Sequence, residues 1–163
     1  MKFKKGRNIV ITDPCYLIRE ETKYLDRETS EYGTKLDRLG FTDFMVSNTG
    51  VGDGTWKVYT TPFDLSNVKD YLEEFYKSQS SIEKLLKSSK EIGGYAADSG
   101  QTCVVYRDEV LGYNPGFFSS INPICFTEIV NDSGFDVEFW KISSKFLHIG
   151  GISGDKSLKF FTY

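Results

Sequence analysis

The chain has 163 residues, which suits a single domain spanning residues 1–163 with its own hydrophobic core. Hydrophobic residues make up 39% and charged residues 26% of the chain, a balance typical of globular proteins and not of disordered ones. The formal net charge is −3 and the basic residues are dispersed, apart from a short cluster at Lys2, Lys4, Lys5 and Arg7, so no strong signal for nucleic-acid binding is present.

A short strand followed by a tight turn begins the predicted fold. Residues 8–12 are mostly β-branched and end at Asp13-Pro14, where proline removes a backbone donor and restricts the residue before it. Residues 20–39 are rich in charged side chains and carry an imperfect helical stripe that stops at Gly40. This segment predicts one or two short surface helices.

The middle of the chain predicts a hairpin and then a helix. Residues 41–48 and 55–61 have strand character, and the glycine-rich segment 49–54 between them is typical of a hairpin loop. Apolar residues recur at spacings of three and four across 64–86, which predicts an amphipathic helix that is interrupted at 78–81.

The remaining segments predict more short strands. A second hairpin is expected over 95–106, a helical turn over 107–113, a third hairpin over 124–142, and two further strands over 145–163. The expected fold is α+β, with about eight short strands in a mainly antiparallel, curled or barrel-like sheet and a central helical insertion.

Three aspartates stand on tight turns at the ends of predicted strands. Asp13 precedes proline, Asp53 lies between two glycines, and Asp98 precedes Ser99. An aspartate in a turn commonly bonds its own backbone, but carboxylates from three turns can also converge on one polar site. We predict such a shared site, with these candidate binding residues: Asp13, Tyr16, Asp53, Thr55, Trp56, Asp98, Ser99 and Gln101.

The predicted ligand is small and polar or nucleotide-like. The rings of Tyr16 and Trp56 would stack on a planar ring of the ligand, at about 1–3 kcal/mol by analogy with base stacking. The carboxylates of Asp53 and Asp98 would accept hydrogen bonds from its hydroxyl or amino groups. No cofactor, metal ligand or catalytic residue is expected, and the sequence leans against an enzyme because no motif places a nucleophile beside a base.

Two alternatives remain open. In the first, Asp13, Asp53 and Asp98 hold a divalent metal ion and hydrolyse a phosphoester, since hard cations bind carboxylate oxygens. In the second, the protein inhibits a host protein through surface aromatic residues or a sheet edge. The 13 Phe and 10 Tyr residues suit the second alternative, although core packing also accounts for them.

The cysteines indicate free thiols in a reducing compartment. Cys15, Cys103 and Cys125 show no C-x-x-C spacing, and with His148 they would form a zinc site only at unfamiliar spacings. The N-terminus lacks the apolar segment of a signal peptide, and no stretch approaches the ~20 apolar residues needed to span a bilayer. We therefore expect a cytoplasmic protein without a membrane partner.

The three turns also carry a resemblance. At Asp13-Pro14-Cys15-Tyr16, Gly52-Asp53-Gly54-Thr55-Trp56 and Ala97-Asp98-Ser99-Gly100-Gln101 the chain resembles small uncharacterised proteins encoded by phages and bacteria. The resemblance covers residues 8–113 and brings no established activity with it. It implies a small accessory protein that acts on host machinery, for example by sequestering a host immune signal.

Overall fold

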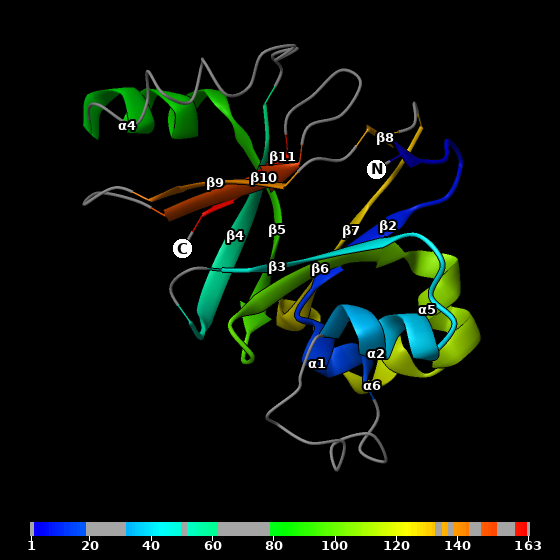
Figure 1. Ribbon diagram of the computed structural model, residues 1–163. Helices are drawn as coiled ribbons and strands as arrows, with labels where there is room; N and C mark the ends of the chain where they lie inside the picture. Colours follow the sequence, from blue (N-terminus) through cyan, green and yellow to red (C-terminus); the bar gives the residue numbers. More distant parts are fainter. Residues whose placement is uncertain are drawn as a thin grey trace.

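A computed structural model describes residues 2–18, 32–49, 52–61, 79–132, 135–136, 139–143, 148–152 and 159–162, and the structural statements below concern these residues (Figure 1). The strands are β1 (Lys2–Phe3), β2 (Ile9–Thr12), β3 (Phe44–Asn48), β4 (Gly54–Thr60), β5 (Lys90–Ala97), β6 (Gln101–Tyr106), β7 (Phe126–Ile129), β8 (Phe135–Asp136), β9 (Phe139–Ser143), β10 (His148–Ile152) and β11 (Lys159–Thr162). The helices are α1 (Pro14–Leu17), α2 (Tyr32–Arg38), α4 (Gln79–Ser88), α5 (Arg107–Tyr113), α6 (Phe117–Ser120) and the 3-10 turn η3 (Pro123–Cys125).

The strands form three antiparallel sheets. Their orders are β3-β6-β2-β7, β5-β4-β11-β10-β9 and the small pair β1-β8. The fold is therefore mixed α and β with antiparallel pairing, as the sequence predicts. The expectation of a barrel-like sheet is wrong, because the sheets are not closed into a barrel.

The four-stranded sheet is the middle layer of the part of the chain that is described. In β2, Ile9 and Ile11 face one core cluster while Val10 faces the other. In β6, Val104 and Val105 divide between the two clusters in the same way. One cluster is shared with β4 and β5, and the other is covered by α1, α2, α5 and α6, which lie together on the opposite side of the sheet (Figure 1). Apolar residues on both strand faces account for this burial.

The two central hairpins that the sequence predicts are not formed. β3 pairs with β6, and β4 pairs with β5, so the strands before and after each tight turn belong to different sheets. β6 has no free edge for β5, because β2 occupies one side and β3 the other. The turn before β4 and the turn at Asp98–Gly100 therefore carry the chain from one sheet to the other.

The predicted hairpin over 124–142 is also wrong in its pairing. β7 pairs with β2 and β8 pairs with β1, so each finds a partner from the N-terminal end of the chain. β9, β10 and β11 form antiparallel neighbours at the C-terminal end, and β10 and β11 match the two further strands expected over 145–163.

The predicted helix over 64–86 is described only in its second half. α4 starts at Gln79 and includes Ser80 and Ser81, so these serines do not interrupt the described helix. Residues 62–78 lie outside the described residues, as does the part of the helical prediction over 20–39 that precedes α2. The central helical insertion is therefore not confirmed. Of the helices that are described, none has both the length and the apolar character required to cross a membrane.

Candidate functional site

The Asp13 side chain is buried, with 0% of its surface exposed. It caps α1, because its Oδ1 accepts a hydrogen bond from the Cys15 amide at 2.7 Å, and Pro14 occupies the first helical position where no donor is needed. This is the structural turn role that an aspartate before proline permits.

Asp13 also fastens the turn at Asp98–Gly100. Its Oδ2 accepts a hydrogen bond from the Ser99 amide at 2.6 Å, and its Oδ1 accepts another from the Ser99 hydroxyl at 2.6 Å. Three donors therefore surround one buried carboxylate. Such charge-assisted bonds are stronger than neutral ones, and they hold two segments that are distant in sequence.

The two turns that connect the sheets pack against each other. The Thr49 amide donates to the Gly100 carbonyl at 2.8 Å, and the Thr49 hydroxyl donates to the Gly52 carbonyl at 2.9 Å. Gly100 has a φ of +69°, and a Cβ there would stand 3.1 Å from the Gly52 Cα. Glycine at position 100 is therefore required both by the backbone conformation and by the close approach.

Tyr16 joins the same cluster from α1. Its hydroxyl donates a hydrogen bond to the Asp98 carboxylate, which is exposed. Burial raises the pKa of Tyr16 above its ordinary value, and the bond to Asp98 raises it further. Burial and then the negative charge of Asp13 likewise raise the pKa of the Cys15 thiol, so Cys15 stays protonated at neutral pH and is a poor nucleophile.

We expect the free energy of unfolding to fall as the pH rises above about 8.5, the ordinary pKa of a cysteine. In the folded chain, burial first and the Asp13 charge second hold the pKa of Cys103 well above that value. The unfolded chain then binds fewer protons than the folded one, and each such group lowers the free energy of unfolding by about 1.4 kcal/mol per pH unit. Urea unfolding at several alkaline pH values measures the slope. Cys103→Ala should reduce that slope by the contribution of one proton, about 1.4 kcal/mol per pH unit. Equal slopes in the two proteins would show that the Cys103 thiol does not cause the pH dependence.

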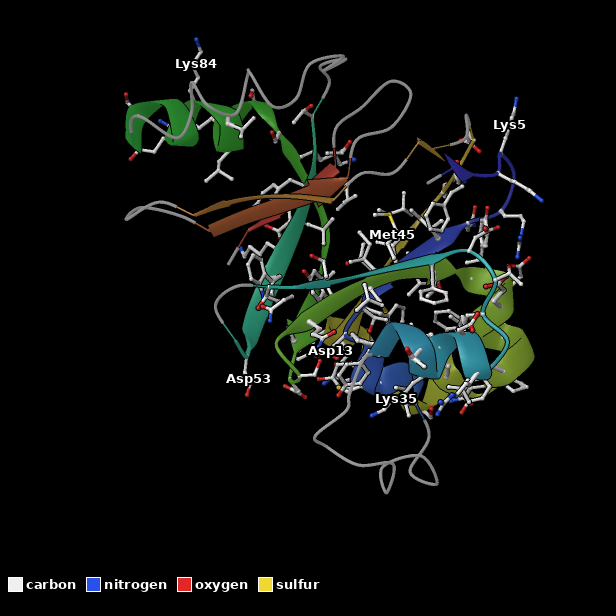
Figure 2. All side chains as sticks on the ribbon, viewed as in Figure 1. Lys5, Asp13, Lys35, Met45, Asp53 and Lys84 are labelled. Carbon is white, nitrogen blue, oxygen red and sulfur yellow. The ribbon has the colours of Figure 1, made fainter. Side chains whose placement is uncertain are left out.

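The remaining candidate residues do not join this cluster as predicted. Trp56 is 1% exposed, and its ring stacks on Tyr95 in the core with centroids 6.5 Å apart, so it offers no face to a ligand. Asp53 is exposed and points away from the body of the molecule (Figure 2). Thr55 is exposed beside it on β4, and Gln101 is half-buried at the start of β6.

The three turn carboxylates do not make a metal centre. Within the described ranges, which include Asp13, Asp53 and Asp98, no three His, Cys, Asp or Glu side chains gather in a way that could hold a metal ion. The physical reason is that the Asp13 carboxylate is already bonded to Ser99 and Cys15, while Asp53 points outward. The hydrogen bonds of Asp13 therefore have a structural role, because they hold the turns together.

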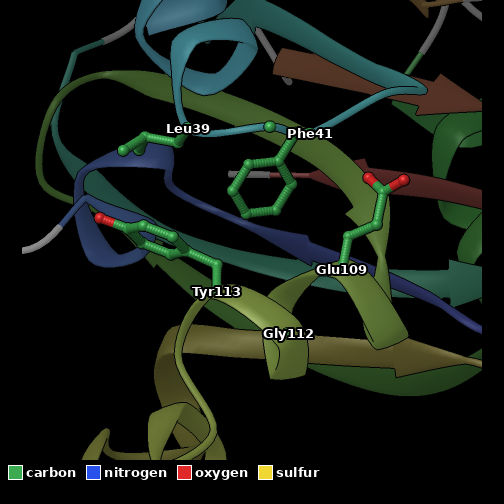
Figure 3. A pocket seen from close by; sticks show the side chains of 6 residues that line it. Leu39, Phe41, Glu109, Gly112 and Tyr113 are labelled. Carbon is green, nitrogen blue, oxygen red and sulfur yellow. The ribbon is translucent and has the colours of Figure 1, made fainter.

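A surface pocket lies elsewhere, between the connection from α2 to β3 and the helix α5. Its volume is about 370 Å³, and we call it the α5 pocket (Figure 3). Its lining residues are Leu39, Gly40, Phe41, Glu109, Gly112 and Tyr113. The ring of Phe41 is 2% exposed and belongs to the core that the helices cover, so one wall of the pocket is rigidly supported.

Glu109 supplies the charged group of the α5 pocket. Its Oε2 accepts a hydrogen bond from the Thr42 amide at 3.2 Å, and its Oε1 accepts one from the Thr42 hydroxyl. A longer contact of 3.5 Å joins its Oε1 to the guanidinium of Arg7. These contacts fix the carboxylate in one orientation beside the two aromatic rings.

Gly112 is an unusual residue for its position in the pocket wall. It lies inside α5, where glycine costs about 1 kcal/mol relative to alanine. No positive φ requires it, and a Cβ built there would meet none of the described atoms within 4 Å. Neither a left-handed backbone conformation nor a close contact with the described residues therefore requires glycine at position 112.

Sequence reasoning did not identify the α5 pocket. It placed a helical turn over 107–113 but assigned no role to Glu109, Gly112 or Tyr113. The glycine inside a short helical segment is the signal that could have drawn attention to this region. Phe41 could not have been found in the same way, because a single aromatic residue at the start of a strand usually reports core packing.

Comparisons with known proteins do not extend this picture. No family model, no curated protein and no solved structure matches the chain. The resemblance to phage and bacterial proteins therefore stays a prediction.

Proposed function

We propose that the protein is a small-molecule binding module whose ligand occupies the α5 pocket. The observation that carries this proposal is a pocket of about 370 Å³ whose wall carries the half-buried ring of Tyr113 and the carboxylate of Glu109. Ligand pockets commonly have volumes of about 300–1,000 Å³, and this pocket lies near the lower end of that range.

The charge of the pocket restricts which of the small polar or nucleotide-like ligands that the sequence predicts can bind there. A carboxylate in the wall accepts hydrogen bonds from amino or hydroxyl groups, and it repels phosphate. The pocket therefore favours an uncharged or cationic molecule, such as a nucleoside or an amine, over a nucleotide. An association with phages and a role against host immunity remain part of the proposal, supported only by the resemblance of the turns.

A protein-binding role has one observation in its favour. Ile124 is 60% and Val130 is 62% exposed, and these residues flank β7 at the edge of the four-stranded sheet. Two exposed apolar side chains do not make a patch of the size that specific interfaces need. The phosphoester hydrolase has less support, because the three turn carboxylates form no metal centre.

Filling the α5 pocket is expected to abolish ligand binding without unfolding the protein. In Gly112→Leu the new side chain occupies the volume that the ligand needs. Nuclear magnetic resonance titration with adenosine, adenosine monophosphate, tryptamine and choline measures binding through the amides of residues 39–42 and 109–113. In the wild type we expect shifts with at least one uncharged or cationic probe, and weaker shifts with adenosine monophosphate than with adenosine.

Two further variants serve as controls. Gly112→Ala should raise the free energy of unfolding by about 0.5–1 kcal/mol, because alanine has the higher helix propensity and meets no atom there. Lys84→Leu places the same leucine on an exposed position of α4, remote from the pocket (Figure 2), and should leave the shifts unchanged. If no probe shifts these amides, or if Gly112→Leu leaves the shifts intact, the pocket is not the binding site.

A further inference from the structure

We propose that Ser99 and Asp13 form a catalytic pair, a serine nucleophile with its carboxylate base, that hydrolyses small carboxylic esters at the turn Asp98–Gly100. This activity goes beyond ligand binding in the α5 pocket and does not depend on it. Three features of the turn support it: the contact between a hydroxyl and a buried carboxylate, the amides that orient this carboxylate, and a phenol beside the serine.

The Ser99 hydroxyl and the Asp13 carboxylate have the geometry of a nucleophile and its base. The Ser99 Oγ donates to Asp13 Oδ1 at 2.6 Å, within the ~2.6–3.2 Å expected of such a pair, although the two residues are 86 positions apart in the sequence. Figure 2 shows Asp13 beside the turn that leads into β6. Ser99 is half-exposed, so a substrate can reach its hydroxyl, whereas Asp13 is 0% exposed. Bulk water therefore does not compete with Ser99 for the carboxylate.

Two backbone amides hold the base in its orientation. Asp13 Oδ2 accepts a hydrogen bond from the Ser99 amide at 2.6 Å, and its Oδ1 accepts one from the Cys15 amide at 2.7 Å. A base that is oriented by further groups is characteristic of an activated nucleophile. The turn itself is also fixed, because the Thr49 amide donates to the Gly100 carbonyl at 2.8 Å. The pair therefore keeps its geometry in the absence of a substrate.

The phenol of Tyr32, at the start of α2, supplies a hydrogen-bond donor beside the nucleophile. Its hydroxyl interacts with the Ser99 side chain. Burial is the largest of the causes that raise the pKa of Tyr32, so the phenol is protonated at neutral pH and able to donate. A donor in this place stabilises the negative oxygen that forms when an ester carbonyl is attacked.

The reaction that these groups support passes through an acyl-serine. The Ser99 Oγ attacks the ester carbonyl carbon while its proton moves to Asp13 Oδ1, and the carbonyl oxygen becomes negative beside Tyr32. The bond to the alcohol then breaks, and Asp13 gives the proton to the leaving oxygen. In the second half, water attacks the acyl group, and Asp13 takes a proton from the water and returns it to the Ser99 oxygen. One ester and one water molecule thus give one acid and one alcohol.

The charge of the turn restricts the class of ester. Asp98 is exposed and directly precedes Ser99, and its carboxylate is held by a hydrogen bond from the Tyr16 hydroxyl. A negative charge at this point repels phosphate and carboxylate groups. The half-exposed position of Ser99 gives better access to a short acyl group than to a long one. The expected substrates are therefore small neutral or positively charged esters, such as acetyl esters.

An alkyl fluorophosphonate and 4-nitrophenyl acetate test the pair in the full chain. The fluorophosphonate forms a bond between the serine Oγ and phosphorus, fluoride leaves, and the base takes the proton. We expect mass spectrometry of the wild type to show one added phosphonyl group and to place it on Ser99. We also expect the wild type to hydrolyse 4-nitrophenyl acetate about a hundredfold faster than Ser99→Ala does. Ser119→Ala makes the same change at an exposed serine of α6 and should leave labelling and hydrolysis unchanged.

Two further variants test the base and the donor separately. Asp13→Asn keeps the shape of the side chain and removes the base, so labelling and hydrolysis, each normalised to the folded fraction from circular dichroism, should fall about a hundredfold. Tyr32→Phe keeps the pair and removes the donor, so hydrolysis should also fall about a hundredfold. If the folded wild type is not labelled at Ser99, or is no faster than Ser99→Ala, the catalytic pair does not exist. Labelling of Ser99 that persists in folded Asp13→Asn would overturn the role of Asp13 as the base.

Discussion

Asp13→Ala is expected to lower the free energy of unfolding by about 3–5 kcal/mol, one of the largest effects of any single substitution in this chain. The variant leaves the Cys15 amide, the Ser99 amide and the Ser99 hydroxyl without their acceptor, in a place where the carboxylate is fully shielded from water. Unsatisfied buried donors cost about 1–3 kcal/mol each, and loss of a helix cap costs about 1 kcal/mol. Urea unfolding at neutral pH measures the change.

Two variants of the neighbouring turn distinguish the contribution of the buried Asp13 carboxylate to stability from that of the exposed Asp98 carboxylate. Ser99→Ala removes one of the three bonds and should cost about 1–2 kcal/mol, with a coupling to Asp13→Ala in a double-mutant cycle. Asp98→Ala removes the exposed carboxylate of the same turn and should cost less than about 1 kcal/mol. An Asp13→Ala protein as stable as the Asp98→Ala protein would show that the carboxylate does not hold the turns together.

Trp56→Ala is expected to destabilise the protein by a comparable amount, about 3–5 kcal/mol, because it empties a large volume in the core between the sheets. Trp56 is 1% exposed and stacks on Tyr95 at an angle of 9° between the ring planes. A tryptophan that served only as a stacking surface for a ligand would cost less than about 0.5 kcal/mol on removal. Thermal and urea unfolding therefore distinguish the core role from the one that the sequence predicts.

Thr55→Ala is the matched control, because Thr55 precedes Trp56 on the same strand and its side chain is exposed. It should change the free energy of unfolding by less than about 0.5 kcal/mol. A small effect of Trp56→Ala alongside an equally small effect of Thr55→Ala would contradict the burial of the indole ring.

The sequence predicts the positions of the strands well but not their partners. Alternation and β-branched residues located β2, β4 and β6 to within about two residues, since these signals are local. Strand pairing depends on which strand edges remain free. Residues 102–106 of β6 are buried on both faces of the strand. A hairpin prediction that uses only the turn residues takes no account of this burial. The turn residues therefore predict where the turns lie, but not that each turn connects two different sheets.

The candidate site was predicted in a similar, partial way. The turns bearing Asp13 and Asp98 do lie together, but the buried Asp13 carboxylate is bonded to the amide and the hydroxyl of Ser99 and does not line an open pocket. Trp56 was misplaced because a period-two pattern does not state which face of a strand is covered. The rings and the carboxylate of the α5 pocket come from two separate segments, and only the tertiary fold brings them together.

The position of β2 between β6 and β7 has a consequence for the newly made protein. This strand is synthesised before both of its partners, which follow it in the chain by roughly a hundred residues. Until Ile129 has emerged, Ile9 and Ile11 have no completed sheet to join and remain accessible to chaperones. The central layer therefore closes only after Ile129 has emerged, and the five-stranded sheet waits longer still, because β4 needs β11 (Lys159–Thr162) as its neighbour.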